Sequence, residues 1–158
     1  MKTLRLVTFL TLVFACAATA TYGQAATKTP NREYDAALAK RLGADQRGMK
    51  NYVLVVLKKG PKYDLIKGDE RKEIFKGHFA NIGRLAKEGS LLVAGPFDDA
   101  NSDWAGLFVF NVDSVEAAQK LTETDPTIKG GVFIGEYHKW YGSAAMMEIG
   151  RIHNTLTP

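Results

Sequence analysis

The amino-acid sequence predicts an α+β domain of the ferredoxin-like type, with strands and helices in the order β-α-β-β-α-β. Three observations support this. Four runs are rich in β-branched and aromatic residues, two helical patterns separate them in the order that this fold requires, and only a short polar turn joins the second run to the third. We therefore expect one four-stranded antiparallel sheet with both helices on one face.

The first half of the predicted domain contains a strand and a long helix. The run "NYVLVVLKKG" (51–60) is the first strand, and it stops at Gly60 and Pro61. Asp69 is a candidate N-cap for a helix that runs to about Lys87, because acidic residues occupy its first turn and Gly89 follows its end.

The second half begins with a hairpin. "SLLVAGPF" (90–97) and "WAGLFVFNV" (104–112) are the second and third strands, joined by the turn-rich segment 98–103. Asp113 is a candidate N-cap with Glu116 three residues later, which predicts a helix that ends before Asp125 and Pro126. "VFIGEYHKWY" (132–141) is the fourth strand.

The predicted strands are apolar at nearly every position instead of alternating. Helices on one face would leave the other face of the sheet apolar and exposed to water. We therefore expect a homodimer that packs through the open sheet face.

The N-terminal segment has the features of a secretory signal. Residues 1–20 carry Lys2 and Arg5, then an apolar run, then Ala-Thr-Ala at 18–20, which is typical of a signal-peptidase site. The apolar run is shorter than the roughly 20 residues of a membrane-spanning helix, so we expect export to the periplasm or the exterior without a permanent membrane anchor. An uncleaved anchor, or a lipoprotein processed at Cys16, are the alternatives.

The composition divides the rest of the chain into three segments. Residues 21–49 are polar and alanine-rich and predict a flexible leader or a short helix, residues 50–141 form the domain, and residues 142–158 form a C-terminal tail without an assigned role. Cys16 is the only cysteine, so cleavage would leave no thiol for disulfides or metal binding.

The charge and the motifs exclude several classes of function. The formal charge of +4 falls by two when Lys2 and Arg5 are removed, and the remaining basic residues are dispersed, which argues against nucleic acid as a partner. The three histidines lack metal-ligand spacing, and no Walker-type loop or nucleophile elbow is present. We expect no cofactor and no metal.

His78 poses the main question, because it lies on the apolar stripe of the first predicted helix with Ile74 and Ile82. An imidazole among aliphatic side chains needs a partner for its ring nitrogens. A satisfied structural histidine is the simplest explanation, and an aspartate before proline, such as Asp125, is often only a turn or cap residue.

The motifs resemble those of the YCII-related (YciI-like) family of small dimeric α/β-barrel domains. The resemblance covers about residues 50–141 and includes H-x-x-x-I-x-x-L-x-x-E-G-x-L-L-x-A-G-P (78–96), G-L-F-V-F (106–110), S-V-E-A-A (114–118) and D-P-T-I-K-G-G-V (125–132). Thr127 stands where the family often has an aromatic residue. The resemblance implies that His78 and Asp125 form a catalytic dyad, in which the carboxylate fixes the tautomer and the second ring nitrogen acts as a base.

Other candidate residues are less specific. Asp98 and Asp99 follow the Gly95-Pro96 turn and could bind substrate at a pocket mouth, although a solvated turn is the alternative. His138 on the last strand could also face the pocket, with edge or interface packing as the alternative.

The resemblance implies an enzyme without a cofactor, a lyase, isomerase or dehydrochlorinase-like catalyst that acts on an unknown small molecule of cyclic or aromatic type. The signal-like segment 1–20, which is an addition to the family pattern, makes it an exported one. The alternative is a periplasmic module that binds a small ligand or serves only as a structural dimer. An open pocket beside a hydrogen-bonded His78–Asp125 pair would favour a site, whereas a sealed core would favour the structural role.

Overall fold

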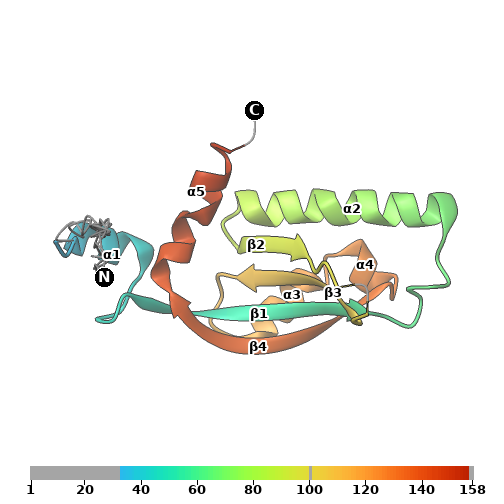
Figure 1. The fold of residues 1–158 in the computed structure, drawn as a ribbon, viewed down its shortest axis with the longest axis horizontal. Helices are drawn as coiled ribbons and strands as arrows, with labels where there is room; N and C mark the ends of the chain where they lie inside the picture. The colour runs from blue at the N-terminus through green and yellow to red at the C-terminus, as the bar shows by residue number, and fades with distance from the viewer. Residues whose placement is uncertain (1–32, 100, 157–158) are drawn as a thin grey trace, which may run out of the picture. The chain divides into compact units, whose positions relative to one another are not determined.

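The computed structural model describes residues 33–99 and 101–156 (Figure 1). The expected signal peptide at 1–20, with the cleavage site and Cys16, lies outside the described residues, as do residues 21–32 of the expected leader. Among the helices of the described ranges, none is long and apolar enough to cross a bilayer.

Four antiparallel strands form one sheet in the order β2-β3-β1-β4 (Figure 1). The two central strands are β1 (Met49–Lys59) and β3 (Trp104–Phe110), and the two edges are β2 (Leu91–Pro96) and β4 (Phe133–Ser143). This is the ferredoxin-like arrangement, and the predicted fold class is confirmed.

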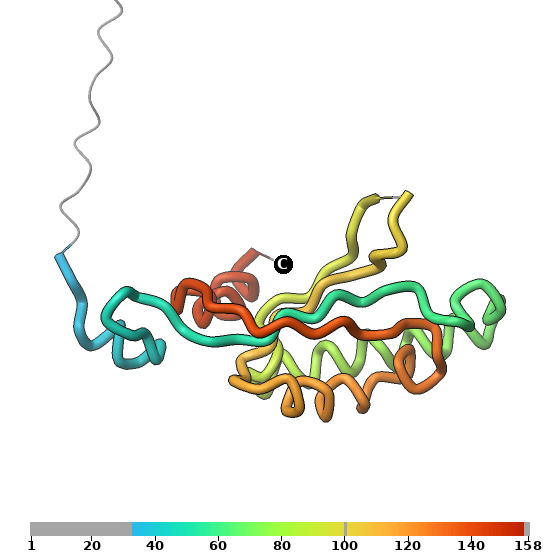
Figure 2. The backbone as a smooth tube through the Cα atoms, turned by 90° about the horizontal axis from the view of Figure 1, so that it is seen from below, coloured from blue at the N-terminus to red at the C-terminus, as the bar shows by residue number. Residues whose placement is uncertain are grey.

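Two long connections are helical and share one face of the sheet. Helix α2 (Gly68–Lys87) joins β1 to β2, and helix α3 (Val115–Thr122) follows β3. Figure 2 shows both helices on the same side of the strands. A further short helix, α4 (Pro126–Lys129), precedes β4 and was not predicted.

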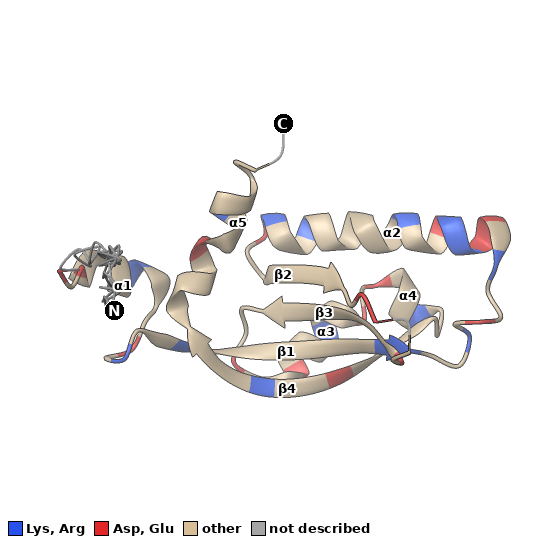
Figure 3. Cartoon of the chain, viewed as in Figure 1, with Lys and Arg blue, Asp and Glu red and all other residues tan. Residues whose placement is uncertain are grey.

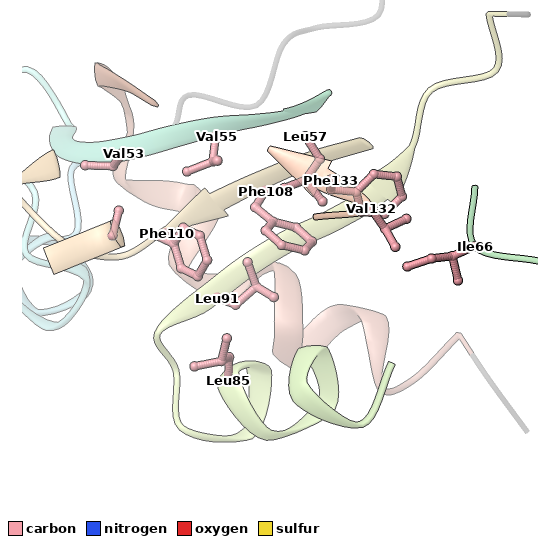
Figure 4. Packing of buried hydrophobic residues seen from close by; sticks show 11 residues of the cluster. Val53, Val55, Leu57, Ile66, Leu85, Leu91, Phe108, Phe110, Val132 and Phe133 are labelled. Carbon is pink, nitrogen blue, oxygen red and sulfur yellow. The ribbon is translucent and has the colours of Figure 1, made fainter. Parts of the chain in front are cut away.

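The core lies between the sheet and this helical layer (Figure 4). Alternate residues of β1 point toward the helices, because successive side chains of a strand face opposite sides. Val53, Val55 and Leu57 occupy these positions, and none of them is more than 2% exposed. The other buried apolar members of the cluster are Ile66, Leu85, Leu91, Phe108, Phe110, Ala118, Val132 and Phe133.

Two predicted helix caps are wrong. Lys67 precedes α2 without a side-chain cap, and Asp69 lies inside the first turn, where it pairs with Lys72 at 2.7 Å. Ser114, not Asp113, caps α3 by accepting from the backbone N–H of Ala117. Asp113 and Ser114 are both good capping residues, and tertiary packing decides which one is used.

The ends of the domain meet each other at one end of the sheet. Helix α1 (Ala36–Leu42) lies in the segment expected to be a leader or a short helix, and it contacts the 3₁₀ helix η1 (Ala144–Glu148) of the tail. Arg41 pairs with Glu148 at 2.6 Å. Helix α5 (Ile149–His153) follows η1 and lies beside β2. The tail therefore packs on the domain.

The sheet face opposite to the helices is only partly covered. On this face Tyr52 and Val109 are buried, whereas Ile134 and Trp140 are 48% and 38% exposed. Figure 3 shows that the strands carry few charges, while basic and acidic residues form bands along α2. The helix thus has a solvated outer surface, and its apolar stripe faces the sheet.

Candidate active site

His78 lies in the middle of α2, on the stripe that faces the sheet. Ile74 and Ile82, one turn before and one turn after it, both pack against the core. The whole residue is only 6% exposed. Its position therefore follows from the helical pattern in the sequence.

Asp125 lies between α3 and α4 and begins the second of these helices. Its backbone is extended, Pro126 occupies the first helical position, and its Oδ1 accepts from the backbone N–H of Thr127 at 2.9 Å. This is the usual chemistry of an N-cap followed by proline. Asp125 has no exposed surface at all.

The two residues meet because α2 and α4 approach closely. A Cβ atom added at Gly77 would lie 2.8 Å from Cγ of Pro126, so glycine is the residue that permits this approach. Nδ1 of the neighbouring His78 lies 2.7 Å from Oδ2 of Asp125. The sequence-predicted pair is thus brought within hydrogen-bond distance; its catalytic role stays a prediction.

Thr127 completes the surroundings of the carboxylate. Its hydroxyl donates to Oδ1 of Asp125 at 2.7 Å and lies 3.3 Å from Nδ1 of His78. Burial raises the pKa of the Asp125 carboxyl, but the hydrogen bonds from His78 and Thr127 outweigh it, and the net pKa lies below its ordinary value. The carboxyl is therefore ionised at neutral pH.

Aromatic rings surround the imidazole. Phe108 of β3 lies nearly parallel to it, with ring centroids 6.0 Å apart and an angle of 26°. Three more rings approach edge-on or at steep angles at centroid distances of 5.4 to 5.8 Å, namely Phe75, Phe79 and Phe133. The imidazole therefore lies in an aromatic environment on the side of the pocket.

The second ring nitrogen of His78 is accessible. Nε2 has no hydrogen-bond partner among the described residues, and the same residues contain no buried side-chain nitrogen or oxygen without a partner. Nε2 must therefore be reached by solvent. Asp125 thus holds one ring nitrogen, and the other has no partner among the described residues.

His78 opens into a pocket of about 290 Å³ between α2 and the β2–β3 hairpin. His78 is its only titratable side chain, and the remaining lining is apolar. The other lining residues are Leu57, Phe75, Phe79, Ile82, Ala94, Gly95, Pro96, Ala105, Gly106, Phe108 and Phe133. Small-molecule sites commonly combine an apolar lining with a few polar groups in this way.

A second hollow, of about 440 Å³, lies at the start of α2 beside Gly68, Arg71 and Lys72. It is much more open than the His78 pocket. The Arg71 guanidinium donates to the backbone oxygen of Tyr63 at 2.9 Å and Lys72 pairs with Asp69, so both cations have partners within the chain. We therefore regard this hollow as an ordinary depression of the surface and not as a binding site.

The structure does not bring the other predicted site residues to the pocket. Asp98 and Asp99 lie in the loop after β2 and are not among the lining residues; Asp99 accepts from the backbone of Asn101 at 3.1 Å. His138 lies on the opposite face of the sheet, 2.9 Å from Glu136, with half of its side chain exposed. In the described part of the chain, no three acidic, histidine or cysteine residues converge as metal ligands.

Sequence reasoning did not assign Thr127 or Phe79 to the site. Thr127 follows an Asp-Pro pair, and an N-cap places the residue two positions later against the capping carboxylate. That spacing was the available signal. Phe79 lies at the pocket with 64% of its surface exposed, and nothing in its sequence context distinguishes it from a surface residue.

Comparison with known proteins places the chain in a family. The model of the YCII-related domain matches residues 51–140. The uncharacterized protein YjpA of Bacillus subtilis (strain 168) is 35% identical over 60 residues, which are 38% of this chain and 67% of YjpA. The 5-chloro-2-hydroxyhydroquinone dehydrochlorinase TftG of Burkholderia phenoliruptrix AC1100, solved with 2,5-dihydroxybenzoquinone, aligns with a TM-score of 0.41 at 16% identity, over 58% of this chain and 93% of TftG. On the family match, the chain belongs to the YCII-related domain family.

Proposed function

We propose that this protein is a cofactor-independent enzyme in which His78 and Asp125 act as a general acid–base pair on a small, uncharged molecule. The observation that carries the proposal is that the two imidazole nitrogens have different surroundings. Nδ1 lies 2.7 Å from a buried carboxylate, and Nε2 is accessible beside an open pocket. A histidine that served only packing would have no need for a free nitrogen there.

The proposed chemistry is proton transfer. With its proton on Nδ1, donated to Asp125, the imidazole carries a lone pair on Nε2 that can accept a proton from a substrate C–H or O–H. The carboxylate then stabilises the imidazolium. The same proton can return to another carbon in an isomerisation, or remain on Nε2 while a leaving group departs in an elimination.

The pocket lining indicates the class of substrate. No Lys, Arg, Asp or Glu lines the pocket, so a charged molecule would lose its hydration without gaining an ionic partner. Phe75, Phe108 and Phe133 offer ring surfaces for an apolar cyclic or aromatic molecule. A volume near 290 Å³, at the lower end for small-molecule sites, suits one or two rings.

Two further parts of the proposal concern the setting of the enzyme. A homodimer through the open sheet face is supported by the exposed Ile134 and Trp140 on that face. Export to the periplasm or the exterior is supported by the sequence of residues 1–20. The alternative function, a non-catalytic ligand-binding or structural dimer module, is favoured by the nearly complete burial of the pair.

A ligand screen tests the proposal. Neutral monocyclic and bicyclic phenols, quinones and ketones are scored by thermal shift on the full chain, and stabilising compounds are then followed for turnover by NMR. His78→Asn is the informative variant, because its amide can still donate to Asp125 while Nε2 is removed; His138→Ala is the matched control on the other sheet face. Turnover that is lost in the first and kept in the second supports an enzyme. Compounds that bind both variants equally and never react would favour the binding module.

A further inference from the structure

The two oxygens of the Asp125 carboxylate have different tasks. Oδ1 accepts two hydrogen bonds from Thr127, one from its backbone N–H at 2.9 Å and one from its hydroxyl at 2.7 Å. Oδ2 faces Nδ1 of His78 at 2.7 Å. The backbone N–H alone satisfies the requirements of an N-cap, so the hydroxyl is a second donor that capping does not need.

The position of the Thr127 hydroxyl matters for the imidazole. Its oxygen lies 3.3 Å from Nδ1 of His78, and its one proton is directed to Oδ1 of Asp125. A hydroxyl has only one proton to donate, so its lone pairs are what Nδ1 meets. If Nδ1 were unprotonated, its own lone pair would face lone pairs from both Oδ2 and Oγ1. The arrangement is therefore compatible only with a proton on Nδ1.

We propose that Thr127 is a positioning residue, whose hydroxyl holds the Asp125 carboxylate ionised and oriented so that His78 keeps its proton on Nδ1 and its lone pair on Nε2. The inference deepens the proposed function, because it names what keeps Nε2 in the form of a base. All three groups are almost fully buried: His78 is 6% exposed, and Asp125 and Thr127 are not exposed at all. Water therefore cannot easily replace the hydroxyl as a donor.

The experiment compares Thr127→Val with Thr127→Ser in the full chain, labelled with ¹⁵N and ¹³C. Valine keeps the shape and the capping N–H but removes the hydroxyl, whereas serine keeps the hydroxyl. The His78 signals are identified by their loss in His78→Asn. The readouts are the exchange rate of the His78 Nδ1 proton with water and the pH titration of the Asp125 carboxyl carbon.

Thr127→Val should raise the pKa of the Asp125 carboxyl by about one unit, the equivalent of one lost hydrogen bond to a charged group, and should speed exchange of the Nδ1 proton about tenfold. Thr127→Ser should leave both close to the parent protein. A purely structural hydroxyl would lower the melting temperature without moving either signal, and that result would overturn the inference.

A variant with a weaker donor covers the case in which Thr127→Val does not fold. Thr127→Cys should show an intermediate pKa and exchange rate, because a thiol donates weakly. Equal values for the Ser and Cys variants would also count against the inference. These measurements need no substrate, so a failure here is distinguishable from a failure to find any reaction: the pair can be positioned by Thr127 in a protein that has no catalytic activity.

Discussion

Replacing Asp125 is the sharpest perturbation of the site, because the same carboxylate caps α4 and holds His78. In Asp125→Ala three donors lose their acceptor in a buried place: the backbone N–H of Thr127, its hydroxyl and Nδ1–H of His78. Each unsatisfied buried donor costs about 1 to 3 kcal/mol. Some relaxation of the hydroxyl and the imidazole lowers the sum, so we expect a loss of about 3 to 5 kcal/mol in the free energy of unfolding.

Asp125→Asn should separate stability from chemistry. The amide oxygen can replace Oδ1 and keep both donors from Thr127, while the NH₂ group then faces Nδ1 of His78. An NH₂ group donates, so Nδ1 must become an acceptor and the ring proton must move to Nε2. We expect a cost of only about 1 to 2 kcal/mol, since all three hydrogen-bonding positions keep a partner and only the charge of the carboxylate is lost, together with complete loss of any activity that needs a base at Nε2.

Urea unfolding at pH 7, with the slope of the transition checked for constancy, measures both losses. The ¹⁵N shifts of the His78 ring report which nitrogen carries the proton. The reasoning is refuted if Asp125→Ala costs less than about 1 kcal/mol, which would mean that water or other groups satisfy the donors. It is also refuted if Asp125→Asn leaves the proton on Nδ1.

Three further outcomes are expected. The folded-state pKa of Asp125 lies below the unfolded value near 3.8, so its stabilisation is complete above that value and is lost as the pH falls through the folded pKa; urea unfolding below about pH 4 should show this loss, and Asp125→Asn should show a flatter profile. Gly77→Ala should destabilise the protein because its Cβ would lie 2.8 Å from Pro126, whereas Gly83→Ala, which meets nothing within 4 Å, should stabilise the same helix by up to about 1 kcal/mol; equal melting temperatures would contradict the close approach. Ala94→Phe should fill the pocket and abolish ligand-induced thermal shifts, and undiminished shifts would place the ligand elsewhere.

Much of the fold is contained in the local pattern of the sequence. The strands β1 and β3 are predicted by their continuous apolar runs. Helix α2 is predicted by the stripe of Ile74, His78 and Ile82, because burial of one helix face places such residues every three to four positions. Helix α4 was missed since four residues carry no period, although Asp125-Pro126 is a known start signal. The packing of η1 and α5 depends on long-range contacts, such as Arg41 with Glu148, that no local pattern contains.

The candidate site was predictable in part. His78 and Asp125 are 47 residues apart, and their partnership came from the resemblance to a family; the residues alone allowed either a site or a structural pair. The placement of His138 could have been predicted from alternation. Phe133 and Tyr137 pack on the core, so His138 must face the opposite side of β4. Exposure of Asp98 and Asp99 depends on the path of their loop, which only tertiary structure fixes.

Capping and the proposed catalysis are not competing explanations for Asp125, because its two oxygens have different partners. Oδ1 begins α4 and Oδ2 holds the imidazole, so burial that would otherwise protonate the carboxyl is offset by donors from both sides. A cap needs neither a histidine at 2.7 Å nor a pocket beyond it. What separates a structural pair from a catalytic one is the far nitrogen of the ring, and in this protein Nε2 has no partner within the described chain and opens toward an apolar cavity. Water that reaches Nε2 satisfies it, so its exposure costs the fold little, and a ligand that enters the pocket would replace that water.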